Sequence, residues 1–264
     1  MRITVVQSPY FMPEPADEHI ATFLLKELEK TERNSLIVLP EYSNAGGISD
    51  KVAMENAMPR AEMMLKRASG IAKEKQAYVA INVFVRRDGE MKNSTYLFDK
   101  QGETAFIYDK IHLPPSEIAL GITPGTGACT CEVDGIRFGF LTCYDVYFNE
   151  QIEFLAAQKP DILIVPSYQR SERADIIHAQ TKLIAFRCNA FVARASYCMN
   201  SDSQGGCAMI VGPDGQIYAQ FSAEIGSLTA EIDPHFKYMR TAGFGGGEIR
   251  NDAFIDAGLR PDAF

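Results

Sequence analysis

Short apolar runs alternate with longer amphipathic segments through the first half of the chain. Residues 3–7 and 36–39 are mostly apolar, which is typical of short strands buried in a sheet. In residues 17–33, apolar positions recur three and four residues apart, and this spacing predicts a helix with one buried face. Residues 59–75 predict a second helix, with Pro59 in its first turn.

Two Asp-Gly pairs indicate hairpins between further predicted strands. The pairs stand at 88–89 and 134–135, and such dipeptides favour two-residue hairpin loops. The strands that they join are residues 77–85 with 94–98, and residues 131–133 with 136–141. Between the two hairpins, residues 105–108 predict another strand, and residues 113–127 are rich in Pro and Gly without clear periodicity.

The second half of the chain repeats the alternation. Helices are predicted at residues 150–158 and 173–189, and strands at 161–165, 191–199, 207–211, 216–221 and 227–232. This order predicts an α/β fold in which two mixed sheets are covered by helices. No linker-like stretch divides the sequence, so we expect residues 1–264 to form one domain. Periodicity fades after His235, and residues 238–264 are expected to form a C-terminal arm or tail.

Charge and composition exclude several classes of function. The net charge is −8 and no cluster of Lys and Arg occurs, which argues against nucleic-acid binding. No apolar run approaches the ~20 residues of a membrane-spanning helix. The first residues read directly as a strand, without the cleavage site of a secretory signal. We therefore expect a small-molecule partner, with neither nucleic acid nor membrane.

Six irregularly spaced cysteines in a chain of this length do not indicate a disulfide framework. Reduced thiols and a cytoplasmic location are expected. Cys143 stands apart because it ends an apolar run just before a helix-like segment. There the helix dipole and free backbone N–H groups are expected to stabilise a thiolate. We interpret Cys188, Cys198 and Cys207 as small buried hydrophobes.

Two further ionisable residues occupy the same kind of position as Cys143. Glu41 follows the apolar run 36–39, and Lys110 follows the strand-like residues 106–108. Functional residues gather at the carboxyl ends of strands in α/β sheets. A thiol that attacks a carbonyl or nitrile carbon, a carboxylate that takes the proton and a cation that stabilises the oxyanion suffice for covalent acyl chemistry. The histidines lack metal-ligand spacing, so neither a metal nor another cofactor is expected.

Short sequence motifs surround these three positions. They are Leu-Pro-Glu-Tyr at 39–42, Tyr-Asp-Lys-Ile-His-Leu at 108–113 and Thr-Cys-Tyr-Asp at 142–145. In this order they resemble the nitrilase superfamily, the carbon–nitrogen hydrolases. The resemblance covers nearly the whole chain and includes Met-Ile-Val-Gly-Pro-Asp-Gly at 209–215.

The resemblance implies a role for each residue. Glu41 is the expected general base, Lys110 the oxyanion stabiliser and Cys143 the nucleophile that forms a thioester. The backbone N–H of Tyr144 is a further oxyanion donor. Glu117, in the loop after Lys110, corresponds to a second glutamate that positions substrate or assists proton transfer in many members. The resemblance also implies a four-layer-forming α-β-β-α sandwich and a homodimer or higher homo-oligomer.

The leading prediction is an amidase or carbamoylase that hydrolyses a small linear amide or N-carbamoyl compound and releases ammonia. Cleavage of a nitrile ranks second. The family often has arginine and proline where this chain has Tyr147 and Asn149, so no substrate name is transferred. We expect Tyr144, Tyr147, Tyr168 and Arg170 to line the pocket, with Arg170 suited to a substrate carboxylate.

Two other classes stay open. A catalytically silent scaffold or binding protein of the same fold has no chemical reason to keep Glu41, Lys110 and Cys143 together. A different thiol hydrolase would use His112 or His178 as its base. In that case a Glu41→Gln variant would keep most of its activity, and replacing the histidine by alanine would remove it.

Overall fold

The computed structural model describes residues 1–48 and 50–260. Twelve of its strands form one mixed sheet with two halves. The first half consists of β1 (Arg2–Pro9), β2 (Ser35–Val38), β3 (Tyr78–Arg87), β4 (Glu90–Phe98), β5 (Thr104–Asp109) and β12 (Gly226–Glu231). The second half consists of β6 (Thr130–Val133), β7 (Ile136–Phe140), β8 (Ile162–Pro166), β9 (Phe191–Cys198), β10 (Met209–Val211) and β11 (Ile217–Gln220).

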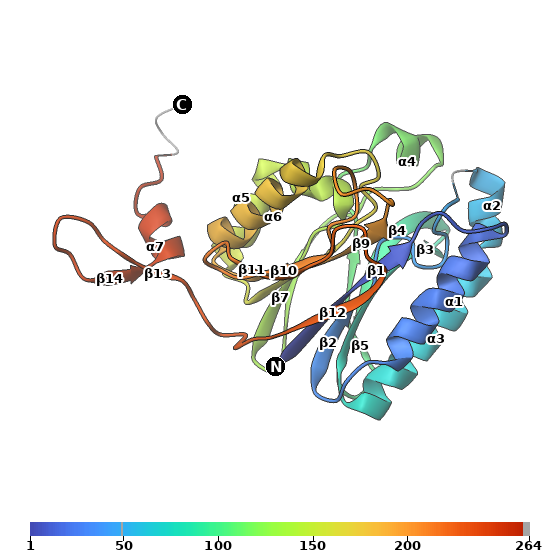
Figure 1. The fold of residues 1–264 in the computed structure, drawn as a ribbon, viewed down its shortest axis with the longest axis horizontal. Helices are drawn as coiled ribbons and strands as arrows, with labels where there is room; N and C mark the ends of the chain where they lie inside the picture. Colours follow the sequence, from blue (N-terminus) through green and yellow to red (C-terminus); the bar gives the residue numbers. More distant parts are fainter. Residues whose placement is uncertain (49, 261–264) are drawn as a thin grey trace.

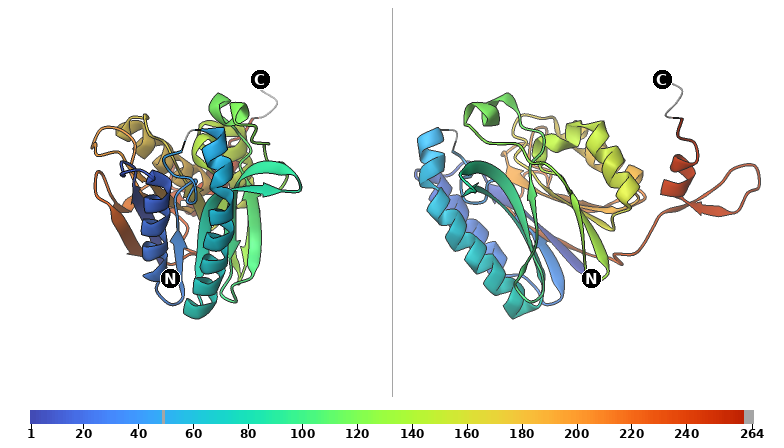
Figure 2. Two further views of the ribbon diagram at one scale, coloured as in Figure 1. Left: turned by 90° about the vertical axis from the view of Figure 1, so that its right-hand side faces the viewer. Right: turned by 180° about the vertical axis from the view of Figure 1, so that it is seen from behind.

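A short parallel pairing joins the two halves. β1 pairs with β9 only from Gln7–Ser196 to Pro9–Cys198, while β12 pairs along the rest of the same edge of β1. Helices α1 (Ala16–Glu29) and α3 (Met58–Lys75) cover the first half, and α5 (Asn149–Gln158) and α6 (Ala174–Cys188) cover the second (Figures 1 and 2). The predicted α-β-β-α arrangement is confirmed.

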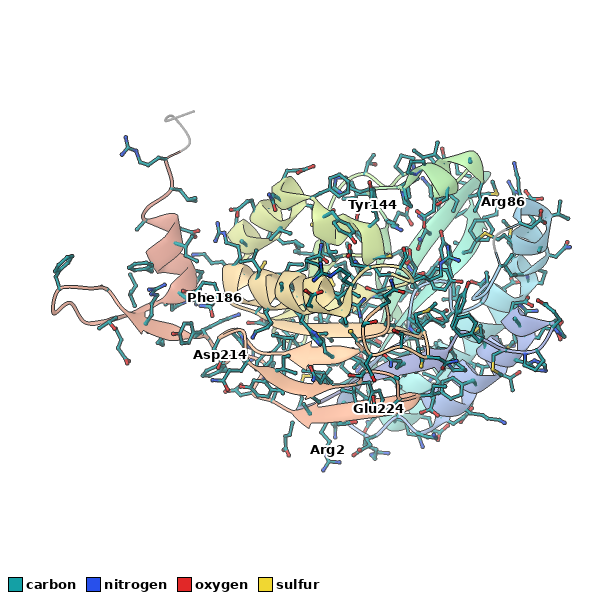
Figure 3. The ribbon with its side chains drawn as sticks, turned by 45° about the horizontal axis from the view of Figure 1, so that its top comes forward. Arg2, Arg86, Tyr144, Phe186, Asp214 and Glu224 are labelled. Atoms are coloured by element: carbon teal, nitrogen blue, oxygen red, sulfur yellow. The ribbon has the colours of Figure 1, made fainter. Side chains whose placement is uncertain are left out.

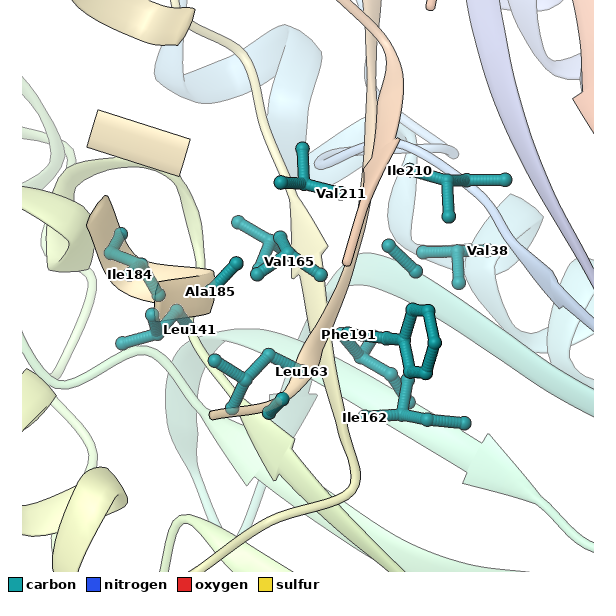
Figure 4. Close-up of a cluster of buried hydrophobic side chains, with 14 of the residues drawn as sticks. Val38, Leu141, Ile162, Leu163, Val165, Ile184, Ala185, Phe191, Ile210 and Val211 are labelled. Carbon is teal, nitrogen blue, oxygen red and sulfur yellow. The ribbon is translucent and has the colours of Figure 1, made fainter. Parts of the chain in front are cut away.

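The core explains why β2 is a continuous apolar run. Leu36 and Val38 pack into the interior between the two halves, while Ile37 and Leu39 pack under α1 and α3. Successive side chains of a strand point to opposite faces, so both faces of β2 must be apolar. Figure 4 shows Val38 in the hydrophobic cluster between the two halves, together with Ile162 and Phe191 from the second half.

The predicted hairpins are present, and several short elements were missed. Asp88 and Gly89 both have positive φ in the two-residue loop between β3 and β4, as that turn requires. The loop at residues 113–127 contains α4 (Pro115–Ala119), and α2 (Lys51–Asn56) precedes α3. A single 3₁₀ turn, η1 (Cys143–Tyr147), separates β7 from α5. We call η1 the Cys143 turn. Elements this short carry no periodic pattern.

The C-terminal residues are more ordered than their sequence pattern indicates. They form the hairpin of β13 (Met239–Thr241) and β14 (Glu248–Arg250), followed by α7 (Asn251–Asp256). Figure 1 shows this arm projecting beyond the sheets near the end of α6. The Asn189 amide at the end of α6 donates to Asp252, 2.8 Å away. Residues 261–264 of the predicted arm lie outside the described residues. No described helix is both long enough and apolar enough to span a membrane.

Candidate active site

Three strand ends meet at one cluster of ionisable side chains. Glu41 follows β2, Lys110 follows β5 and Cys143 follows β7, as predicted. The Lys110 ammonium donates to Glu41 Oε1 at 2.8 Å, and both residues are at most 2% exposed. Cys143 lies close enough to this pair that the charges of Glu41 and Lys110 both act on the pKa of its thiol. The carboxylate therefore bonds to the ammonium and lies beside the thiol.

Glu117 joins this cluster from α4. Its Oε1 accepts from the Lys110 ammonium at 2.9 Å and from the Tyr42 hydroxyl at 2.5 Å. Its Oε2 is buried and has no hydrogen-bond partner within the described part of the chain. Burial raises the pKa of Glu117, and the charge of Glu41 adds to the effect, while Lys110 opposes it. The structure thus brings the predicted second glutamate to the same ammonium as Glu41.

The backbone is strained at two of these positions. Tyr42 has φ +56° and Cys143 has φ +48°, a left-handed conformation that residues with a side chain seldom adopt. The Cys143 turn is held by a capping box in which Asp145 accepts the backbone N–H of Thr142. Asp145 also accepts the Tyr108 hydroxyl at 2.7 Å, which fixes the turn to β5.

Neither of the two histidines proposed as alternative bases has a hydrogen bond to Cys143 among the described residues. His112 Nδ1 contacts Asp145 and Gln151, at 3.1 and 2.9 Å, and its ring stacks on Phe148. The Nε2 atom of His178 is buried without a hydrogen-bond partner within the described residues. The charges that act on the Cys143 thiol are those of Glu41 and Lys110.

The electrostatics of Cys143 differ from the sequence expectation. Burial raises the pKa of the thiol well above its usual range, and the charge of Glu41 raises it further, against the opposing charge of Lys110. The expectation of a resting thiolate is therefore wrong. A single 3₁₀ turn supplies few aligned dipoles, whereas burial and the charge of Glu41 both act on the thiol. For Lys110, burial opposes the charge, but Glu41, Cys143 and Glu117 outweigh it and raise its pKa.

A cavity of about 340 Å³ opens at the sulfur of Cys143. Tyr144, labelled in Figure 3, lines it together with the other three predicted pocket residues, Tyr147, Tyr168 and Arg170. The Arg170 guanidinium lies over the Tyr168 ring, 5.1 Å from its centroid. The structure thus brings the four residues together, and their contact with substrate stays a prediction.

Sequence reasoning missed the amides that support the cluster. Asn93 on β4 donates to Glu41 Oε1 at 2.8 Å and to Glu117 Oε1 at 3.2 Å. Asn82 on β3 donates to Asn93 and accepts the backbone N–H of Tyr42. A signal was available, because Asn82 interrupts an otherwise apolar strand, and a buried amide needs partners.

Comparison with known proteins decides the family. Residues 2–237 match the family model described as carbon–nitrogen hydrolase. The chain belongs to the carbon–nitrogen hydrolase family. The predicted nitrilase-superfamily membership is confirmed.

Relatives of this carbon–nitrogen hydrolase include proteins named 2-oxoglutaramate amidase. One from Bacillus subtilis is 29% identical over 216 residues, which cover 78% of this chain and 81% of the relative. Another from Paenarthrobacter nicotinovorans is 29% identical over 215 residues, which cover 75% of this chain and 72% of the relative.

The fold is shared with solved amidase structures. An amidase mutant from Nesterenkonia sp. AN1, with acrylamide added at its active-site cysteine, aligns with a TM-score of 0.75 and 19% identity. That alignment covers 88% of this chain and 93% of the amidase.

Proposed function

We propose that this carbon–nitrogen hydrolase cleaves a small linear amide or N-carbamoyl compound through a Cys143 thioester and releases ammonia. One observation carries the proposal. Glu41, which is 1% exposed, accepts a hydrogen bond from the Lys110 ammonium at 2.8 Å, and the charges of both residues act on the thiol of Cys143. This arrangement provides a base for the nucleophile and a cation for the charge that develops during attack.

The first half of the reaction follows from these contacts. The sulfur of Cys143 attacks the carbonyl carbon as the thiol proton passes to Glu41, so the raised thiol pKa is overcome only when substrate is present. Negative charge then grows on the carbonyl oxygen, and the Lys110 ammonium and the backbone N–H of Tyr144 stabilise it. Glu41 returns the proton to the nitrogen, the C–N bond breaks, and ammonia leaves a thioester behind.

The second half releases the acid. Glu41 takes a proton from a water molecule, which attacks the thioester carbon, and the proton finally returns to the sulfur. Glu117 supports both halves. Its unpartnered Oε2 is an acceptor for an N–H of the substrate amide, while its Oε1 holds Lys110 in place. General acid–base help of this kind contributes about 10²–10⁴-fold to the rate.

We infer that Arg170 recognises a substrate carboxylate. Its guanidinium lines the cavity and forms no ion pair within the described residues; its bonded partner is the Tyr10 hydroxyl, 3.0 Å away. Two relatives bear the name of an amidase for 2-oxoglutaramate, which carries a carboxylate. Equal loss of affinity for charged and neutral amides in an Arg170→Ala variant would contradict this role.

Ammonia release tests the proposed reaction directly. Purified protein is offered short amides, N-carbamoyl amino acids, ureido acids and nitriles, with Cys143→Ala as the control. Release from amides or carbamoyl compounds that is lost in the control supports the proposal. Release from nitriles alone would make the protein a nitrilase. No release, together with a Cys143 that alkylating reagents do not label, would indicate a silent scaffold.

We also propose a homodimer or higher homo-oligomer formed through α5 and α6. Their outer face exposes Phe154 (50%) and Leu183 (65%), both large apolar side chains. The arm extends past the same end of the molecule, where it can reach a second copy (Figure 1). Monomeric sedimentation at micromolar concentration would contradict the dimer.

All six cysteines are free, which fits the cytoplasmic location that we propose.

A further inference from the structure

A carboxylate lies in the wall of the cavity, and the reaction steps above do not use it. Glu172 lines the cavity together with Cys143 and Tyr147. Within the described part of the chain it forms no ion pair. Its hydrogen-bond partners are the Tyr147 hydroxyl, 2.5 Å from Oε2, and the backbone N–H of Arg173, 2.9 Å from Oε1.

A chain of hydrogen bonds fixes the direction of the Tyr147 proton. Arg194 on β9 donates to Gln169 Oε1 at 2.9 Å, and a guanidinium can only donate. The amide nitrogen of Gln169 therefore points the other way and donates to the Tyr147 oxygen at 3.1 Å. The single hydroxyl proton of Tyr147 is left to donate to Glu172. Every bond in the chain thus runs from Arg194 towards Glu172.

The charges at the two ends of this chain are opposite. Arg194 is 1% exposed, and its other contacts are the carbonyl oxygens of Gly206 and Cys207. It forms no ion pair within the described residues, and the chain of hydrogen bonds that starts at its guanidinium ends at the carboxylate of Glu172. Tyr147 cannot donate to a ligand while its proton is engaged. The cavity wall at this point therefore offers an acceptor with negative charge.

The carboxylate has capacity for a ligand. A carboxylate accepts about four hydrogen bonds, and Glu172 accepts two from the protein. The unused lone pairs belong to a group in the same cavity as the nucleophile. A ligand that donates hydrogen bonds and carries a positive charge matches both the unused lone pairs and the negative charge of Glu172. A primary ammonium group is such a ligand, because it has three N–H donors.

We propose that Glu172 binds a protonated amine of the substrate, so that the enzyme prefers small amides whose chain ends in an ammonium group. This inference rests on the proposed amide hydrolysis and adds the chemistry of the far end of the substrate. Arg170 lines the same cavity, so an amide that bears both an ammonium and a carboxylate engages both side chains.

A purely structural role makes a different prediction. Glu172 accepts the first backbone N–H before α6, and this bond alone can explain a carboxylate here. A Glu172→Gln variant removes the charge but keeps one side-chain oxygen for the backbone N–H of Arg173, while its amide nitrogen takes the place of the oxygen that accepts the Tyr147 hydroxyl. Asp175→Asn is the matched control, because Asp175 is exposed, lies on the first turn of α6 and is not part of the cavity wall.

The first measurement compares pentanamide with its ω-amino derivative. We expect kcat/KM of the native enzyme to favour the amino derivative by about tenfold or more, as for a charge-assisted hydrogen bond. Glu172→Gln should reduce this preference to near parity, measured as the ratio of the two kcat/KM values, and Asp175→Asn should keep the ratio of the native enzyme. No preference in the native enzyme, or an equal preference in Glu172→Gln, would overturn the inference.

The second measurement needs no turnover and so separates this inference from the proposed reaction. Cys143 is labelled with aminoethyl methanethiosulfonate, which is cationic, or with the neutral methyl methanethiosulfonate, and Cys143→Ala corrects for other thiols. The ratio of the two rates is unaffected by changes in the thiol pKa itself. We expect a ratio that favours the cationic reagent and falls severalfold in Glu172→Gln only. An unchanged ratio in that variant would refute the ammonium site even if amides are hydrolysed.

Discussion

Replacing Lys110 by methionine tests the electrostatic balance of the candidate site. The ammonium lies 2.8 Å from Glu41 Oε1 and 2.9 Å from Glu117 Oε1, and all three side chains are at least nine-tenths buried. Methionine has a similar length but no charge. The Lys110→Met variant leaves two carboxylates in one buried site without a cation.

The structure indicates the size of the effect. Two oxygens that share one nitrogen lie at most about 6 Å apart, where two charges repel by about 3 kcal/mol at an effective dielectric constant of about 20. Removing one partner of a buried ion pair typically costs about 3–5 kcal/mol. We expect the free energy of unfolding to fall by about 3–5 kcal/mol near pH 8, along with loss of ammonia release.

The loss of unfolding free energy in Lys110→Met should become smaller as the pH falls. Burial already raises the pKa of Glu117, and Lys110 opposes this rise. Without Lys110, the folded-state pKa moves further above the unfolded value. A group whose pKa is raised by folding adds stability below its unfolded pKa and loses that stability as the pH rises through the folded pKa. The variant should therefore be closest to the native protein near pH 5 and furthest from it near pH 8.

Urea unfolding followed by far-UV circular dichroism, at pH 5, 6.5 and 8, provides the measurement. The Lys110→Met, Glu117→Gln double variant is the control, because it removes the charge of one of the two carboxylates that the loss of Lys110 leaves without a cation. It should recover part of the lost stability and flatten the pH dependence. A deficit that is equal at pH 5 and pH 8, or a double variant no more stable than Lys110→Met, would refute the reasoning.

Three further substitutions test other contacts. Asn93→Leu removes hydrogen-bond donors to Glu41 and Glu117. Because a hydrogen bond to a charged group contributes about 1.5–3 kcal/mol, kcat for the preferred amide should fall about 10- to 100-fold. A native-like kcat would contradict this. Asn189→Ala frees the arm from α6, so limited trypsin digestion followed by mass spectrometry should show faster cleavage within residues 238–260. The hydrogen bond to Asp145 raises the pKa of His112, so the stability advantage of the native protein over His112→Gln should grow as the pH falls from 8 to 6 in urea titrations.

The sequence pattern was sufficient to place the three strand ends. The strand before Glu41 is buried at every position, and the strand before Cys143 is buried from Phe138 to Phe140, so both leave an apolar run in the sequence. Glu117 was chosen only by resemblance, since the five residues of α4 are too few to show a helical period. In the structure its carboxylate accepts hydrogen bonds from Lys110, seven positions earlier in the chain, and from Tyr42, which is far away in the sequence.

Long-range polar contacts account for what the sequence did not reveal. Asn93 and Glu172 each look like ordinary polar residues, because their partners come from other strands or loops. The resting state of Cys143 was predicted wrongly for the same reason. The local pattern showed the turn that follows the sulfur, but the carboxylate that controls its proton stands about a hundred positions earlier in the chain.

The edge of β1 has a consequence for the order in which the protein is made. Its neighbours along that edge are β12 and β9, so Arg2 pairs with Glu231 and Gln7 with Ser196. During synthesis this edge of the first strand therefore stays open until residues 226–231 have emerged. Glu41 and Lys110 belong to the half that starts with β1, and Cys143 belongs to the other half. The nascent chain therefore contains the thiol before β1 pairs with β9 and joins the two halves, so the cluster is assembled only after β9 has been made.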